Sequence, residues 1–253
     1  MTSTVGASAV TLLGSGGWMP TPARATSSLL LTAEDESILL DAGTGVAALA
    51  RDPELLGPSG RLVVALSHFH IDHLVGLTYL PALASRLTVE IWAPGRMPLG
   101  DDSREILASI VGGPFLSVTL DGFVSRVVEL TPGENTIGSR TFEVRAQHRH
   151  PGGSVAFRLG DELAYCTDTA PDPDTVPFVR GVDLLVHEAW SPTAPTTEHS
   201  SARSAAESAA SADVGRLVLC HVNPLGDRPA ELLAAALPTF PDTQVGHDGL
   251  GLR

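Results

Sequence analysis

The stretch His68-Phe69-His70-Ile71-Asp72-His73 places four side chains that can bind a metal within six residues. It follows an apolar run, residues 62–67, that is typical of a buried strand. Residues 74–80 favour a helix, and Pro81 is expected to end it. In α/β proteins, functional side chains gather on loops that leave the carboxyl end of a strand and open a helix. The stretch therefore predicts an α/β chain whose site lies at this strand-to-helix turn.

The spacing inside this stretch predicts two groups of ligands. His68 and His70 can point the same way from an extended backbone, whereas Asp72 and His73 enter the next turn and can face a second ion. Imidazole nitrogen and carboxylate oxygen suit zinc and similar divalent ions. The alternative is a histidine cluster on the surface, and the further ligand types found downstream argue against it.

This H-x-H-x-D-H block on a strand-to-helix turn resembles the signature of the metallo-β-lactamase superfamily. Three more residues of matching type follow in order: His150 in a His-Pro-Gly-Gly segment, Asp168 after the apolar run 163–167, and His221 after the apolar run 216–220. The resemblance implies an αββα four-layer sandwich of the α/β class. It also implies that Asp168 bridges two metal ions. The implied ligands are His68, His70 and His150 for the first ion and Asp72, His73 and His221 for the second.

The length and composition fit one domain over residues 1–253 with a well-buried core, because 43% of the residues are hydrophobic. No apolar stretch approaches the length that crosses a bilayer, and residues 1–9 lack the pattern of a secretory signal. Cys166 and Cys220 lie in strand-like runs and are expected to be buried and unpaired in a cytoplasmic chain. The Cys220 side chain is expected to point away from the metal.

The net charge of −13 disfavours a long nucleic acid as the partner. All 16 basic residues are arginines, and they are scattered singly rather than gathered into the basic stripe that releases counterions. We therefore expect a small-molecule substrate and no membrane partner, and a homodimer stays open.

Apolar runs separated by turn residues predict the other elements of the chain. Strands in hairpin-like groups, followed by strands that alternate with helices, fit two sheets between helical layers. Ser200 or Ser201 is expected to cap the first of the two late helices. The expected strands span residues 10–13, 28–31, 37–40, 88–92, 127–130, 141–146, 154–159, 163–167, 184–187 and 216–220, and the expected helices span 103–111, 201–212 and 229–237.

Three features narrow the branch of the superfamily, and two of them resemble the phosphodiesterase branch. His187-Glu188-Ala189-Trp190 resembles the H-E-A-T segment of ribonuclease Z, and His199-Ser200-Ser201 resembles its H-S-T segment. Asp168 stands where zinc β-lactamases have no bridging aspartate, which argues against β-lactam hydrolysis.

Ribonuclease Z carries a long arm that grips tRNA, and only 17 residues separate His150 from Asp168, which leaves no room for it. Smaller phosphodiesterases without the arm look closer, although this chain lacks the cysteines of the extra zinc site that they often carry.

The resemblance implies chemistry at two divalent metal ions, with zinc expected first and manganese or iron as alternatives. A hydroxide that bridges the metals is expected to attack phosphorus, oriented by Asp72 and Asp168. His199 is the candidate donor of the leaving-group proton, because imidazole titrates near neutrality. Glu188 is expected to orient His199 or keep it protonated, with a helix-cap contact as the alternative.

Several neighbouring residues leave a choice. His148 shares strand parity with His150, so either could face the metal, and the His-Pro-Gly-Gly pattern favours His150. Asp41 is expected to brace the metal loop rather than bind metal. The loop at residues 14–17 is expected to form part of the site wall. Trp190 is interpreted as a core residue rather than a wall of the site.

The leading hypothesis is a phosphodiesterase that acts on a small phosphoester, including a cyclic one, through the two-metal centre. The second is a lactone or thioester hydrolase with the same centre, and the third is a non-catalytic accessory protein that binds metal. Ribonuclease Z-like RNA processing is disfavoured. Specificity is expected to lie in the loops at residues 112–120 and 191–197. His187 is expected to be a hydrogen-bonding partner, and His247 to lie in the site wall or at the surface.

Overall fold

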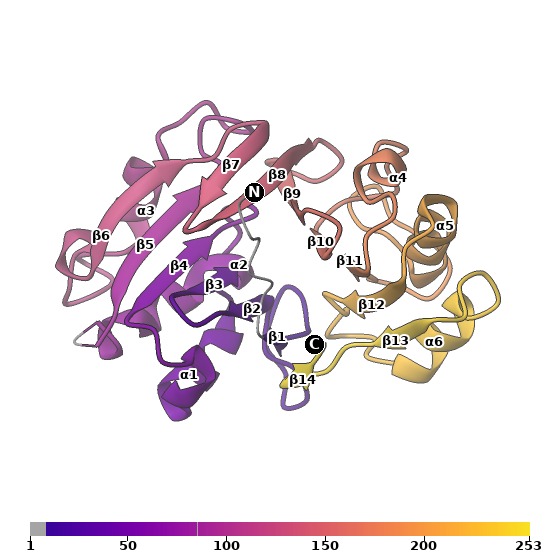
Figure 1. Ribbon diagram of the computed structural model, residues 1–253, viewed down its shortest axis with the longest axis horizontal. Coiled ribbons are helices and arrows are strands. Elements are labelled where there is room, and N and C mark those ends of the chain that lie inside the picture. The colour runs from indigo at the N-terminus through magenta and orange to yellow at the C-terminus, as the bar shows by residue number, and fades with distance from the viewer. Residues whose placement is uncertain (1–8, 85) are drawn as a thin grey trace.

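Two mixed β-sheets of seven strands each face one another, and helices cover their outer faces (Figure 1). The computed structural model describes residues 9–84 and 86–253, so most of the segment considered for a secretory signal lies outside the described residues. The first sheet has the order β14-β1-β2-β3-β4-β5-β6. Its strands are β1 (Ala9–Gly14), β2 (Ser28–Thr32), β3 (Ser37–Leu40), β4 (Arg61–Ala65), β5 (Thr88–Ala93), β6 (Val124–Glu129) and β14 (Leu250–Gly251).

The second sheet has the order β13-β12-β11-β10-β9-β8-β7. Its first strands run antiparallel as hairpins, and β10 to β13 run parallel to one another. Its strands are β7 (Gly133–Ile137), β8 (Arg140–Gln147), β9 (Ser154–Leu159), β10 (Leu163–Cys166), β11 (Leu184–Glu188), β12 (Arg216–Cys220) and β13 (Thr243–Val245).

The helices belong to the two outer layers. In Figure 1, α1 and α3 lie on the outer side of the first sheet, and α4, α5 and α6 lie on the outer side of the second. The α-helices are α1 (Ala47–Arg51), α2 (Ile71–Leu74), α3 (Ser103–Ile110), α4 (Thr175–Phe178), α5 (Ala202–Ala212) and α6 (Pro229–Ala236), and the 3₁₀ helices are η1 (Thr44–Val46), η2 (Pro53–Leu56), η3 (Val75–Ala82) and η4 (Leu120–Gly122).

Three apolar clusters separate the four layers. The cluster between the sheets includes Leu40, Phe142, Phe157 and Val186, and each of the other two joins one sheet to its helices. Alternation along a strand sends successive side chains to opposite clusters, so Val186 faces the other sheet while Leu185 faces the helices. Apolar surface of this kind contributes about 25 cal/mol per Å² when it leaves water. The αββα four-layer sandwich expected from the sequence is confirmed.

Most expected strands form within a few residues of their predicted ends, but the helix expected at residues 74–80 does not form as an α-helix. The α-helix α2 starts earlier, at Ile71, and ends at Leu74, and the 3₁₀ helix η3 continues through Pro81 to Ala82. The reason is that Gly76 N donates to Ala42 O, and His73 O accepts from Ala42 N, so both groups leave the helical ladder. Short elements such as β7, β13, β14, α1 and α4 were not predicted from the sequence.

Both cysteines are buried and free, as expected. Cys220 lies in the cluster between the sheets and Cys166 in the cluster under the helices. Within the described part of the chain, no helix is long and apolar enough to cross a membrane.

The candidate site lies at one rim of the sandwich, where parallel strands of both sheets end. β3 and β4 end there in the first sheet, and β10, β11 and β12 end there in the second. Loops at the carboxyl ends of parallel strands are where α/β folds place their binding residues. The rim therefore collects side chains from distant parts of the sequence.

Candidate metal centre

The turn from β4 to α2 carries the first histidines. His68 is buried, and His70 is the extended residue that precedes α2, with φ −66° and ψ 145°. The ring centroids of His68 and His70 lie 4.6 Å apart, and Ser67 Oγ lies 2.9 Å from His68 Nδ1. This contact leaves His68 Nε2 directed into the rim. Asp72 and His73 follow inside α2.

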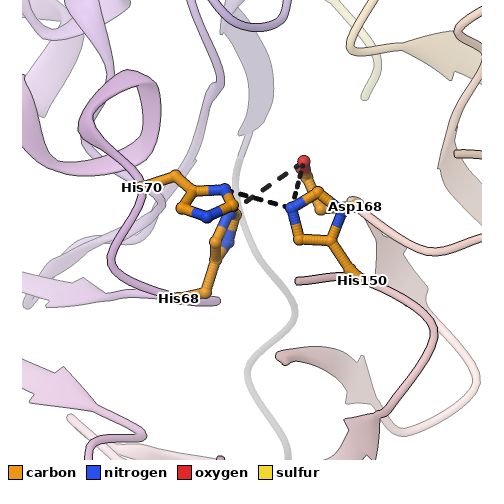
Figure 2. A group of neighbouring side chains, drawn as sticks. All are labelled: His68, His70, His150 and Asp168. Carbon is orange, nitrogen blue, oxygen red and sulfur yellow. Dashed lines mark hydrogen bonds and ion pairs between the residues drawn. The ribbon is translucent and has the colours of Figure 1, made fainter. Parts of the chain in front are cut away.

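The second sheet supplies three residues that face this turn. His150 lies in the loop between β8 and β9, Asp168 follows β10, and His221 follows β12. Asp168 and His221 have φ of 51° and 49°, in the left-handed region that residues with a Cβ rarely adopt. Such strained positions concentrate at functional sites. Figure 2 shows His150 and Asp168 approaching His68 and His70 from the opposite side.

Asp168 lies between two groups of imidazoles. Its Oδ1 is 3.5 Å from His150 Nε2 and 4.0 Å from His68 Nε2, and His70 Nδ1 is 3.0 Å from His150 Nε2 (Figure 2). Its Oδ2 is 3.0 Å from His73 Nε2 and 3.2 Å from His221 Nε2. One carboxylate thus presents a separate oxygen to each group.

Asp72 completes the second group. Its Oδ2 lies 3.4 Å from both His73 Nε2 and His221 Nε2. The ligand atoms of Asp72, His73 and His221 all lie within 4.8 Å of one another, and so do those of His68, His70, His150 and Asp168. The structure therefore brings together all seven residues that the sequence analysis proposed as ligands.

Two buried nitrogen atoms show that the cluster fits cations. His68 Nε2 and His73 Nε2 are buried and form no hydrogen bond, although His73 Nε2 lies 3.0 Å from the Asp168 carboxylate. A buried polar atom without a partner is rare and destabilising unless an ion or water satisfies it. Imidazole nitrogens and a shared carboxylate are the donor set that zinc and similar divalent ions take.

The charges of the cluster favour the forms that bind metal. Burial lowers the pKa of His68, His70 and His150, which keeps these imidazoles neutral. Burial would raise the pKa of Asp168, but the imidazoles of His221, His73 and His68 outweigh it and hold that pKa well below its usual range. The same balance keeps Asp168 ionised, which is the form in which a carboxylate binds metal.

His73 differs from the other imidazoles. Burial lowers its pKa, but the carboxylates of Asp168, Asp41 and Asp72 outweigh burial and raise that pKa well above its ordinary value. The carboxylates at this position thus favour a positive charge, which a divalent ion can supply in place of the proton.

Asp41 braces the metal loop from behind. It directly follows β3 with φ 60°, and its Oδ2 lies 2.8 Å from His73 Nδ1. Asp41 also accepts hydrogen bonds from Ser67 N, Ser67 Oγ and Tyr165 OH. A carboxylate on one ring nitrogen fixes the other nitrogen toward a metal. Asp41 thus holds a proposed ligand in place from the far side of its ring, as expected from the sequence.

The glycine-rich loop after β1 forms part of the wall, also as expected. A Cβ at Gly17 would lie 2.4 Å from His221 Cε1, so only glycine fits there. The next residue, Trp18, donates its backbone N–H to Asp72 Oδ2 over 2.6 Å. The loop therefore holds a proposed metal ligand directly.

A carboxyl–imidazole pair lies beside the cluster. Glu188 ends β11, and its Oε1 accepts from Thr169 N over 2.5 Å, while its Oε2 lies 2.9 Å from His199 Nδ1. This contact directs His199 Nε2 away from Glu188. Burial and the Asp168 carboxylate raise the pKa of Glu188, and burial lowers the pKa of His199. Both shifts favour a neutral pair that shares one proton.

Trp190 is not the core residue that the sequence analysis favoured. It is half-buried, and its ring stacks on His199 with centroids 4.5 Å apart and planes 16° apart. The interpretation as core was wrong because Trp190 lies two residues beyond the end of β11, where the strand alternation no longer decides which way a side chain points.

A pocket of about 500 Å³ opens above the cluster. Several of the proposed ligands line it, and no arginine is among the described residues of its lining. The remaining lining residues are Trp18, Pro151, Trp190, Thr196, Thr197, Glu198 and His199. The expected specificity loop at residues 191–197 contributes to it, whereas the loop at 112–120 does not. Trp18 was not among the residues predicted from the sequence, where its only signal was a tryptophan directly after a glycine-rich loop.

Three histidines lie apart from the cluster. His148 and His247 are exposed, and His187 is buried on the helix side of the second sheet. The Nδ1 of His187 donates to Glu188 O over 2.9 Å, so His187 is a hydrogen-bonding partner within its own strand. The geometry thus favours His150 over His148 as the ligand.

Residues 36–222 match the family profile of the β-lactamase superfamily domain, and the chain belongs to that superfamily. With its fold and its clustered imidazoles and carboxylates, it is a hydrolase of the metallo-β-lactamase fold and lies in the ribonuclease Z-like branch.

Two relatives and two solved structures are similar over most of the chain. Ribonuclease Z of Clostridium tetani is 26% identical over 301 residues, which cover 94% of this chain and 96% of the relative. Ribonuclease Z of Saccharolobus solfataricus is 25% identical over 93% of this chain and 96% of its own. The metallo-β-lactamase fold protein YhfI from Bacillus subtilis has a TM-score of 0.77 at 22% identity, over 97% of this chain and 99% of its own. A diphosphatase from the PhnP family has a TM-score of 0.75 at 18% identity, over 97% of each chain.

Proposed function

We propose that this protein is a phosphodiesterase that uses two divalent ions and acts on a small phosphoester, including a cyclic one. The observation that carries the proposal is the pairing of two features within one pocket. Asp168 presents one oxygen to each of two imidazole groups, and beside it Glu188 holds His199 by Nδ1. The first feature suits a pair of ions, and the second suits donation of a proton to a leaving oxygen.

The proposed ligands are the seven clustered side chains. Zinc is proposed first, with manganese or iron as alternatives, because carboxylates accompany the imidazoles. When bound, two such ions would supply positive charge at the phosphoryl oxygens and lower the pKa of a water from about 16 towards 7. The first ion would take His68, His70 and His150, the second Asp72, His73 and His221, and both would share Asp168.

The protein's own groups would position the reactants and move protons. Asp72 is fixed by the backbone N–H of Trp18, and we assign it the orientation of the attacking water. His199 would donate from Nε2 to the leaving alkoxide, while Glu188 holds its ring through Nδ1. A donor of this kind is worth most for an alkoxide, since a thiolate leaves without protonation. His199 therefore favours phosphoesters over thioesters.

The surface favours a small substrate. Most arginines are already paired with carboxylates, as Arg61 is with Glu36 and Arg145 with Asp172. The net charge is −13, and no arginine lines the pocket. Long polyanions bind through free basic groups that displace counterions. The alignment with the Clostridium tetani ribonuclease Z spans 301 positions against 253 residues here, so that relative has segments that this chain lacks.

RNA processing is the second candidate function. The similarity to ribonucleases Z over nearly the whole chain favours it, against the expectation from the sequence analysis. We also propose that residues 1–253 form one domain, and a homodimer stays compatible with either function.

A substrate panel tests the proposal. The metal-loaded protein is assayed with bis-p-nitrophenyl phosphate, a lactone, a thioester and a tRNA precursor, next to an Asp168→Ala variant purified in the same way. We expect kcat/KM for the diester to exceed the others by about tenfold or more, and the variant to be inactive. A lactone or thioester that is turned over faster would refute the proposal, and faster cleavage of the precursor would establish the second candidate.

A further inference from the structure

Trp18 combines a fixed backbone with a free side chain. It lies in the loop between β1 and β2, with its N–H bonded to Asp72 Oδ2. The preceding Gly17 donates to Val222 O and packs against the ring of His221. The Trp18 side chain is nevertheless 58% exposed and lines the pocket. The loop thus fixes where the indole is attached without burying it.

The fold does not account for this residue. Trp18 adopts φ 61°, a left-handed conformation that is unfavourable for a residue with a large side chain. Among the described residues, the three apolar clusters do not include it. A large aromatic ring that stays exposed also does not gain the free energy that burial of its apolar surface would contribute. An indole held at such a place is better explained by what it contacts in the pocket.

The rest of the pocket defines what could lie against Trp18. Trp190 and Pro151 add further apolar wall, while Glu198 and the proposed ligand Asp72 contribute carboxylates. Since no arginine lines the pocket, a second anionic group on the substrate would find no protein cation. The complementary group is therefore planar, apolar on its faces and uncharged.

We propose that Trp18 is a stacking platform for a planar aromatic substituent of the substrate, an aryl ring or a nucleobase. This inference rests on the proposed phosphodiesterase function and assigns its substrate class: a diester with one uncharged aromatic ester group. The reacting phosphoryl group lies over the metal cluster, and the aromatic group lies across the indole at the mouth of the pocket. Stacking of this kind tolerates different rings, because every such ring has a π-face.

Three diesters with the same p-nitrophenolate leaving group test the platform. Their second ester groups are phenyl, cyclohexyl and thymidin-5′-yl, so that phenyl and cyclohexyl match in size but differ in planarity. For the wild type we expect kcat/KM for the phenyl and thymidinyl esters to exceed that for the cyclohexyl ester by about tenfold, mainly through KM. Trp18→Ala should bring the three esters close together, and Trp18→Phe should keep part of the preference.

The comparison of variants removes the intrinsic reactivity of each ester, which is the same for every variant. Phe115→Ala removes another exposed aromatic ring, outside the pocket, and should keep the wild-type preference. A larger effect for thymidinyl than for phenyl identifies a nucleobase, and the reverse identifies an aryl group. Equal kcat/KM for phenyl and cyclohexyl in the wild type, or a preference that survives Trp18→Ala, would overturn the platform.

Calorimetry tests the same contact without catalysis. Thymidine 5′-monophosphate and 2-deoxyribose 5-phosphate differ only in the base, and their binding to the metal-loaded protein is compared in wild type and Trp18→Ala. We expect the base to tighten binding about tenfold in the wild type alone. If no diester is hydrolysed, the proposed function fails and this titration still decides whether Trp18 stacks. If diesters are hydrolysed but the base adds nothing, the stacking inference alone fails.

Discussion

At the residue scale, three side chains at strand ends define the site. Asp41, Asp168 and His221 all adopt positive φ, and each lies within two residues of the end of a strand of the inner layers. This conformation turns the chain sharply and directs the side chain into the rim rather than along the sheet. Such strain of order 1–3 kcal/mol per residue persists where surrounding contacts hold it. At Asp41 those contacts are the hydrogen bonds from Ser67 and Tyr165.

His199 is the residue whose role is easiest to test. If it donates the leaving-group proton, His199→Ala should lower kcat by about two to four orders of magnitude on a cyclic alkyl diester. The loss should be much smaller on a p-nitrophenyl ester, because p-nitrophenolate leaves without a proton. Steady-state kinetics on the two substrates measure the difference.

His148→Ala serves as the matched control, since His148 is an exposed histidine apart from the cluster. Equal losses on both substrates, with the metal retained, would assign His199 a positioning role instead. Loss of metal from the His199→Ala variant would instead identify His199 as a ligand. The position of His199 near Asp168 and His221 is compatible with that role.

The site residues divide into those that the sequence reveals and those that it does not. His68, His70 and Asp72 stand in a dense motif. Asp168 and His221 each follow an apolar run, and His150 lies in a His-Pro-Gly-Gly segment just before one, so strand ends predict their convergence. Trp18 and Trp190 have no such marker. Their places depend on how two loops cross the rim, and loop shape does not follow from periodicity.

At the element scale, contacts between distant segments changed the expected helix after the histidine motif. Residues 74–80 have a helical pattern, yet Gly76 N bonds to Ala42 O. A Cβ at Gly76 would lie 2.2 Å from Gly43 O, so the two backbones touch. Tertiary hydrogen bonds thus override the local propensity and leave one α-turn followed by a 3₁₀ segment. The late helix α5 forms as predicted, and Ser201 caps its start through a capping box.

Strand β11 carries a buried histidine, His187, which leads to a prediction about how the stability of the protein depends on pH. Burial lowers the pKa of His187 to about 4. Between pH 4 and 6.5 the unfolded chain therefore binds a proton that the folded chain does not, and stability is lost as the pH falls. From pH 6.5 to 4.5 this loss amounts to about 2 kcal/mol.

Urea unfolding of the metal-free protein measures this loss. His187→Gln can still donate to Glu188 O but does not titrate, so the free energy of unfolding of the variant should fall by about 2 kcal/mol less over this range. Parallel pH profiles for the wild type and the variant would show that His187 does not carry the effect.

At the scale of the whole molecule, charge and shape favour a small ligand. The chain carries −13, and most of its arginines are paired with carboxylates. We expect fluorescence anisotropy with a labelled tRNA precursor to give a Kd weaker than about 100 µM at physiological salt. Micromolar binding that weakens steeply with salt would contradict this expectation. It would show that the protein has a basic surface for RNA although most of its arginines are paired with carboxylates.

The metal content of the purified protein tests the two-ion centre most directly. Elemental analysis after metal reconstitution should find two divalent ions per chain. Since His70 and His150 belong to the first group and His221 to the second, each substitution by alanine should deplete one ion, and His148→Ala should deplete neither. Fewer than one ion per chain in the wild type, or loss of an ion on His148→Ala but not on His150→Ala, would contradict the proposed centre.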